Sequence, residues 1–268
     1  MPLPIHVIDA FARRPFTGNP AAVVVLPPDH VADPEWMQAV AAEMKHSETA
    51  FVQSMDADRP VFSLRWFTPG AEVRLCGHAT LATSHTLWTT GHVAIDEPLH
   101  FETLSGRLTC VRTPAGAVRM DFPATRPEAS KPAVGLLAAM GLESVVSCWR
   151  SRFDYLLELP DEAAVVAVRP DFRALRDLAT RGIMVTARGT EVDFVSRFFA
   201  PGVGVDEDPV TGSAHCALTP FWAERLGKPA MRARQLSARG GDVAVELHGD
   251  RVVLEGHAVT VTSGQLLA

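Results

Sequence analysis

Basic residues are in the minority in this chain of 268 residues, which has 25 lysines and arginines against 31 aspartates and glutamates. The formal net charge of −6 argues against nucleic acid as a partner, because phosphate binding needs a surplus of basic side chains on one face. Long apolar runs are also missing. The longest, at about residues 133–142, is too short to span a bilayer. Residues 1–20 contain no basic segment followed by an apolar one, so we expect no secretory signal and no membrane partner.

Cysteine is scarce, and its spacing excludes several kinds of site. The four cysteines form no CxxC pair or disulfide ladder: Cys76, Cys110, Cys148 and Cys216. This usage predicts a reduced, cytoplasmic protein. Ten histidines are present without an HExxH motif or paired cysteines, so no metal site is predicted. Neither a P-loop nor a GxGxxG motif occurs, which argues against a bound nucleotide.

The composition that remains is typical of a globular protein, with 47% hydrophobic residues. The length fits one large domain or two of roughly 130 residues. Extended segments are predicted at residues 5–8, 21–26, 50–52 and 62–66, with a turn at 17–20. A helix is predicted at 34–46 with Asp33 as its N-cap, because apolar residues there recur at spacings of three and four. A second helix, at 79–90, is apolar nearly all round and should be buried.

Part of the first half recurs in the second half. Arg65–Gly70 reads RWFTPG, and Arg197–Gly202 reads RFFAPG. Each segment is followed by a short acidic loop, a glycine turn and a helix of small apolar residues, ending near Gly91 and Gly227. Two similar units could arise by chance, since the match needs a small gap. If the repeat is real, it predicts two halves of like fold.

We place the boundary of these halves after residue 117. The first half is then 1–117 and contains Glu48, with residues 258–268 packing back onto it. The second half is 118–257 and contains the second apolar helix.

The two glycine turns are candidate binding sites. Cys76-Gly77-His78 and Thr211-Gly212-Ser213 each open a helix, and free N–H groups at a helix start favour an anion such as a carboxylate. Glycine there lets a ligand approach the backbone closely. A lone histidine is usually a structural residue, and we interpret His85 and His257 in that way. His78 is a stronger functional candidate because of its place at the turn.

Glu48 has two interpretations. It follows a predicted helix, so it could be a solvated loop carboxylate. However, it directly precedes the apolar residues 50–52, which should draw it towards the interior. A carboxyl group in apolar surroundings can take and return a proton near neutral pH. The pattern alone does not choose between the two.

Several motifs resemble one known family. The matching segments, in family order, are residues 9–11, 16–24, 47–52, 65–69, 72–73, 76–81, 198–201 and 206–214. They include FTGNPAAVV, SETAFV, CGHATL and DEDPVTGSA. In these segments the chain resembles the PhzF family of phenazine-biosynthesis-like isomerases, within the diaminopimelate epimerase and proline racemase superfamily.

The resemblance implies an α+β fold like that of diaminopimelate epimerase, with two similar halves, each a bent mixed sheet wrapped around a central helix. It implies a site in the cleft between the halves and a homodimer that needs no metal or organic cofactor. The family's acid/base glutamate falls on Glu48, and its supporting polar residues fall on His78, Asp208 and Ser213. The residues expected to contact substrate are Asn19, Gly77, Ala79, Thr211, Gly212 and Ala214.

The resemblance also bears on mechanism. Thiol racemases of the superfamily carry two cysteines, one at the start of each central helix. Cys76 stands at the first of these places, but Val210 occupies the second, and Cys216 lies nearly two turns into the helix. A two-thiol racemase is therefore disfavoured, and Cys76 is interpreted as a buried, unreactive thiol. A shuttle with Glu48 as its one base fits better.

The implied substrate is a small carboxylic acid like trans-2,3-dihydro-3-hydroxyanthranilate, in which a proton moves from C3 to C1. Two alternatives stay open on the sequence alone. One is an epimerase or racemase of an amino or hydroxy acid. The other is a non-catalytic binding protein on the same scaffold.

Overall fold

The computed structural model describes residues 2–31 and 33–267. The chain divides into two compact units, unit 1 (Met1–Asp121 and Glu255–Ala268) and unit 2 (Phe122–Leu254). The sequence placed these divisions after residues 117 and 257. The chain leaves unit 1 within strand β8 (Val118–Pro123) and returns within β17 (Arg251–Gly256). Each unit combines a mixed sheet with a few helices, so the fold class is α+β as predicted.

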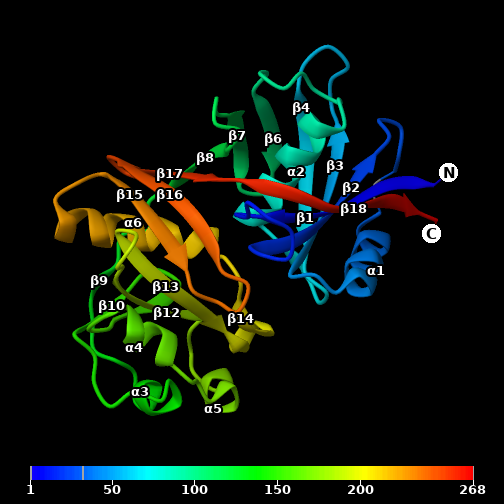
Figure 1. The fold of residues 1–268 in the computed structure, drawn as a ribbon. Coiled ribbons are helices and arrows are strands. Elements are labelled where there is room, and N and C mark those ends of the chain that lie inside the picture. Colours follow the sequence, from blue (N-terminus) through cyan, green and yellow to red (C-terminus); the bar gives the residue numbers. More distant parts are fainter. Residues whose placement is uncertain (1, 32, 268) are drawn as a thin grey trace. The chain divides into compact units, whose positions relative to one another are not determined.

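Unit 1 is a mixed sheet around one buried helix (Figure 1). Its elements before β8 are β1 (Leu3–Ala10), β2 (Asn19–Leu26), α1 (Pro34–Met44), β3 (Glu48–Ser54), β4 (Val61–Phe67), β5 (Glu72–Val73), α2 (Gly77–Thr89), β6 (Leu99–Thr103) and β7 (Gly106–Arg112). Strand β1 is antiparallel to β2, β2 is parallel to β3, and β3 is antiparallel to β4. Strand β4 is parallel to β6, which is antiparallel to β7. The last strand, β18 (Ala258–Leu266), is antiparallel to β1.

Unit 2 follows the same plan. Its elements before β17 are β9 (Glu128–Ala129), α3 (Leu136–Ala139), β10 (Ser147–Arg150), β11 (Asp154–Glu158), α4 (Glu162–Ala167), α5 (Phe172–Arg176), β12 (Gly182–Arg188), β13 (Phe194–Ala200), the 3-10 turn η1 (Pro201–Val203), β14 (Val205–Asp208), α6 (Gly212–Leu226), β15 (Ala230–Gln235) and β16 (Gly241–His248). Strand β10 is antiparallel to β11, β11 is parallel to β12, and β12 is antiparallel to β13. Strand β13 is parallel to β15, which is antiparallel to β16.

The strand register shows that the two units are true equivalents. Thr49 lies opposite Phe67 between β3 and β4, and Ile183 lies opposite Phe199 between β12 and β13. The repeated arginines are also equivalent. Arg65 pairs with Glu72 at 2.7 and 2.9 Å, and Arg197 pairs with Glu207 at 2.7 and 3.0 Å. Each guanidinium lies over the ring of the phenylalanine two residues further on. The prediction of two similar halves is therefore confirmed.

The central helices α2 and α6 are buried on nearly every side, as predicted. Helix α2 packs against β1, β2 and β3, and α6 packs against β15 and β16 (Figure 1). Five Ser and Thr hydroxyls of α2 donate to the carbonyl four residues before them: Thr80, Thr83, Ser84, Thr86 and Thr89. Four of the five residues are buried, and there the back-bonding satisfies hydroxyl groups that the apolar surroundings would otherwise leave without a partner.

Helix α1 confirms the predicted cap and corrects the predicted end. The Asp33 side chain accepts a hydrogen bond from the Glu35 N–H at 3.1 Å. The helix stops at Met44 rather than residue 46, because Lys45 adopts a left-handed conformation with φ 54°. Within residues 2–31 and 33–267, no helix has both the length and the apolar character needed to cross a membrane.

Candidate active site

Glu48 and His78 meet in unit 1. Glu48 is the first residue of β3, and His78 is the second residue of α2. The Glu48 Oε2 atom lies 3.1 Å from His78 Nε2, with 18% of the glutamate side chain and 5% of the histidine side chain exposed. The two atoms are at ion-pair distance, and Oε2 is buried with no hydrogen-bond partner assigned among the described residues. A buried carboxylate oxygen in this state is free to accept a proton.

Asn19 contacts His78 at the ring nitrogen that does not face Glu48. This first residue of β2 is fully buried, and its Nδ2 atom lies 3.2 Å from His78 Nδ1. Ser47 in turn donates from Oγ to Asn19 Oδ1 at 3.4 Å. The sequence predicts substrate contact for Asn19, and in the structure its side chain contacts His78 and Ser47.

Burial and charge act in opposite directions on His78. Burial lowers the His78 pKa. The neighbouring Cys76 and the Glu48 carboxylate together raise it by a larger amount, so the His78 pKa lies well above its usual range. Burial, followed by the Glu48 charge, raises the pKa of the Cys76 thiol to about 11. The Cys76 thiol is therefore neutral at pH 7. The Glu48 carboxylate is then the neighbour that favours the imidazolium form of His78.

Cys76 lies in the same cluster. Its Sγ atom is 3.5 Å from His78 Nδ1, and the residue is 7% exposed. Ligand atoms of Glu48, Cys76 and His78 all lie within 4.8 Å of one another. Sequence spacing did not predict the cluster, because the glutamate comes from a separate strand. A thiol with a raised pKa is a poor nucleophile, which agrees with the interpretation of Cys76 as unreactive.

Asp208 lies in unit 2, at the end of β14, and is bound to the start of α6. Its Oδ2 atom accepts a hydrogen bond from Thr211 Oγ1 at 2.5 Å. Gln235, at the end of β15 and fully buried, secures both residues. Gln235 Nε2 donates to the Asp208 carbonyl at 2.7 Å, and its Oε1 accepts from the Thr211 N–H at 2.9 Å. Gln235 thus fixes the turn that presents Asp208.

Ser213, the second residue of α6, contacts a charged network. Its Oγ accepts a hydrogen bond from Arg181 Nη2 at 3.2 Å. Arg181 also donates from Nε to Asp154 Oδ1 at 2.8 Å and from Nη2 to Asp154 Oδ2. Asp154 is 1% exposed, whereas 35% of the Arg181 side chain is exposed. A buried carboxylate is thus neutralised by a guanidinium that still reaches the surface.

Both glycine turns present backbone donors at helix starts. The N-cap residues Cys76 and Thr211 make no side-chain capping hydrogen bond in the part of the chain that is described. The remaining predicted contact residues lie in these first turns: Gly77, Ala79, Gly212 and Ala214. Their side chains offer no polar atom, so any contact with substrate would use backbone N–H groups.

Four residues of the clusters in the two units were missed by sequence reasoning: Ser47, Asp154, Arg181 and Gln235. Ser47 had a signal, because it adjoins Glu48 in the SETAFV segment. The Arg181 bonds join residues 27 and 32 positions apart, and Gln235 bonds Asp208 across 27 positions. Only strand register brings such residues together.

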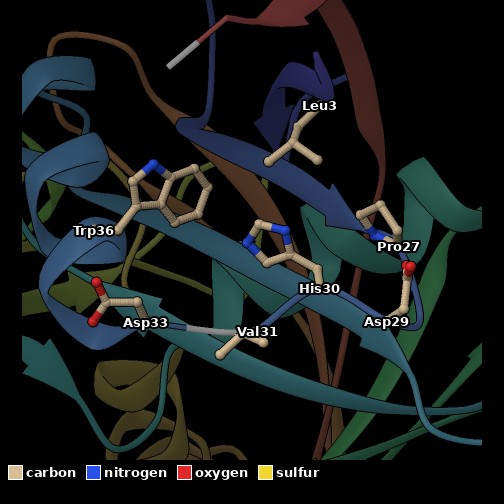
Figure 2. Close-up of a pocket in the computed structure, with 7 residues that line it drawn as sticks. All are labelled: Leu3, Pro27, Asp29, His30, Val31, Asp33 and Trp36. Carbon is tan, nitrogen blue, oxygen red and sulfur yellow. The ribbon is translucent and has the colours of Figure 1, made fainter. Parts of the chain in front are cut away.

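Unit 1 has a hollow that contains none of the predicted site residues. It is lined by Leu3, Pro27, Asp29, His30, Val31, Asp33 and Trp36. Figure 2 shows the His30 and Trp36 rings beside each other, with centroids 5.4 Å apart. Its open position and mixed lining give no chemistry comparable to the Glu48–His78 pair.

Known proteins share this arrangement of motifs. Residues 8–264 match the model of a family described as phenazine biosynthesis-like protein. The chain belongs to this family, PhzF. A relative in Halalkalibacterium halodurans, an uncharacterised isomerase, is 47% identical over 270 residues, covering 100% of this chain and 99% of the relative.

Solved structures of other proteins have a similar fold. A PhzF family protein of Enterococcus faecalis superposes with a TM-score of 0.93 at 40% identity, covering 100% of both chains. A hydroxyproline epimerase of Agrobacterium vitis superposes with a TM-score of 0.62 at 11% identity, covering 99% of this chain and 92% of that one, and shares the fold alone.

Proposed function

We propose that this PhzF family protein is an isomerase that moves a proton within a small carboxylic acid, with Glu48 as its one acid/base. The observation that carries the proposal is the buried Glu48 oxygen at 3.1 Å from His78 Nε2. The raised pKa of His78 favours an imidazolium beside the Glu48 carboxylate, and this positive charge offsets the charge of the carboxylate.

In the proposed reaction, the Glu48 carboxylate removes a proton from one carbon, and the electron pair of that C–H bond enters the conjugated acid. Protonated Glu48 then returns the proton to a second carbon, so no atom is gained or lost. For an acid like trans-2,3-dihydro-3-hydroxyanthranilate, the proton leaves C3 and arrives at C1. His78 orients Glu48 and offsets its charge, and Asn19 holds His78.

The two positions where thiol racemases carry cysteine offer no thiolate base. Cys76 is neutral near pH 7 because its pKa is about 11, and Val210 supplies no thiol. Both observations speak against a two-thiol racemase. From the family resemblance we further propose a cytoplasmic homodimer that acts on a small acid without a metal or organic cofactor.

The test is Glu48→Gln, assayed with trans-2,3-dihydro-3-hydroxyanthranilate. Gln keeps the shape and loses the base, so we expect turnover to fall by at least about 100-fold. Binding of anthranilate, an acid of similar shape that cannot isomerise, should stay within about threefold by calorimetry. Glu43→Gln, which changes an exposed carboxylate of α1, is the matched control and should keep full turnover.

Near-normal turnover in Glu48→Gln would refute the mechanism. Proton transfer can also be followed with substrate deuterated at C3 in ordinary water, where wild type should carry deuterium from C3 to C1 of the product. Exchange of α-protons in proline or diaminopimelate would instead favour an epimerase.

A further inference from the structure

We propose that Trp66 is a positioning residue for Glu48, whose carboxylate accepts a hydrogen bond from the indole N–H group of Trp66. The bond holds the carboxylate beside His78 and favours its ionised form. The proposal rests on the proposed function only where it concerns turnover, because the bond itself can be measured without a substrate.

Two buried polar atoms of unit 1 have complementary chemistry. Trp66 Nε1 is a donor and Glu48 Oε2 is an acceptor, and neither has an assigned hydrogen-bond partner among the described residues. Trp66 is 1% exposed, so solvent does not serve its N–H group. A buried donor without an acceptor costs free energy, and most buried polar groups of native proteins have a partner. One hydrogen bond between these two atoms satisfies both.

The register of β3 and β4 places the two side chains on one face of the sheet. Trp66 lies opposite Ala50, and Glu48 is two residues before Ala50, so all three point the same way. Diagonal neighbours of this kind are within reach of each other when the side chains are long or aromatic. Glu48 contacts His78 of α2, so the shared face is the one that α2 covers. Thr49 has the third unpartnered atom of unit 1, but it points to the opposite face.

The repeat shows that a ring at the position of Trp66 reaches this diagonal neighbour. By the strand register, Phe198 of unit 2 is the equivalent of Trp66. Gly182 is likewise the equivalent of Glu48. A Cβ atom on Gly182 would lie 2.3 Å from Phe198 Cζ, so the ring covers that position of the strand. In unit 1 the ring at this place is an indole with an N–H group, and the neighbour is a carboxylate.

An indole N–H group suits the support of a base because it does not titrate. A carboxylate has about four lone-pair sites, so Glu48 can accept from Trp66 and still face His78. The titratable groups that line this face around Glu48 are His78 and Cys76, at the start of α2. The neighbouring strands β2 and β4 present Asn19 and Trp66, which do not titrate. A hydrogen bond to a charged group corresponds to roughly a tenfold change in an equilibrium, or about one pH unit in a titration midpoint.

The first experiment follows the tryptophan indole N–H groups by ¹⁵N NMR as the pH is changed, without a substrate. In wild type, the Trp66 resonance should shift with the same midpoint as the Glu48 carboxyl group, which is followed by ¹³C NMR. Glu48→Gln should abolish this shift of the Trp66 resonance. Trp88, whose Nε1 donates to the Glu97 carbonyl at 3.0 Å, is the internal control and should show no shift with that midpoint.

The second experiment uses Trp66→Phe, which removes the N–H group and keeps an aromatic ring, as Phe198 does in unit 2. The lost bond favoured the ionised carboxylate, so Glu48 should take up its proton about one pH unit higher. The acid limb of kcat/KM for the dihydro acid should move up with it. A role in packing alone would lower stability and leave both midpoints in place. Trp88→Phe is the matched control and should change neither midpoint.

A Trp66 resonance that does not follow Glu48 would overturn the bond, as would a Glu48 midpoint that is the same in Trp66→Phe and wild type. A Trp66 resonance that moves only when anthranilate binds would also overturn it, by assigning the N–H group to the ligand. The two proposals fail separately. Near-normal turnover in Glu48→Gln would remove the proposed reaction, whereas the two titrations would still decide the bond.

Discussion

His215, the fourth residue of α6, should make unit 2 sensitive to acid. Its ring is fully buried, with Nδ1 2.8 Å from the Thr211 carbonyl, and Nε2 has no hydrogen-bond partner among the described residues. Burial outweighs the Thr211 hydrogen bond and lowers the His215 pKa to about 4, from 6.5 in the unfolded chain. The neutral ring makes its full contribution to the free energy of unfolding above pH 6.5. This contribution is lost as the pH falls from 6.5 towards 4, because in that range only the unfolded chain takes up a proton.

The size of the effect follows from the two pKa values. At 1.36 kcal/mol for each unit, the full loss is about 3 kcal/mol, of which about 2 kcal/mol falls between pH 7 and pH 5. His215→Gln keeps an N–H donor for the Thr211 carbonyl but does not titrate, so it should lose about 2 kcal/mol less than wild type over that interval. Urea denaturation followed by circular dichroism at pH 7, 6 and 5 measures the difference.

The control for this experiment is His248→Gln, which changes an exposed histidine of the same unit and should behave as wild type. Equal losses between pH 7 and pH 5 in wild type and His215→Gln would refute the reasoning. That result would mean that the buried ring takes up a proton in the folded state as easily as in the unfolded chain.

Two further substitutions test the packing around the site by the free energy of unfolding. Gln235→Leu leaves the buried Thr211 N–H and the Asp208 carbonyl without their partner, and should cost about 2 kcal/mol or more; a change below 0.5 kcal/mol would contradict that role. Gly256→Ala would put a Cβ atom 2.3 Å from Phe11 Cδ1, and should cost about 1–3 kcal/mol. Gly264→Ala, at a position with no atom within 4 Å, is the control and should cost less. Equal costs at the two glycines would contradict the clash.

Local patterns predicted much of the fold, because helix caps and apolar runs are formed by residues that are close together in the sequence. Asp33 followed by an amphipathic run gave the helix α1 and its cap, and the apolar run after Gly77 gave the buried helix α2. The end of α1 was missed, because nothing in the sequence marks the left-handed conformation of Lys45. The antiparallel pairing of β18 with β1 joins Leu266 to Leu3, a contact between the two ends of the chain that no local pattern encodes.

The sequence by itself predicted the two-part plan, and its resemblance to the PhzF family singled out Glu48 as the candidate base. The repeated arginine-aromatic segments and glycine turns predicted equivalent halves, and the residues around Glu48 and His78 pointed to an acid site. Tertiary structure decided what each of these side chains touches. It placed Asn19 behind His78, Gln235 under Asp208, and Arg181 against Ser213. These partners depend on strand register and on which turn of a helix faces a strand, and both are set only when distant segments pack together.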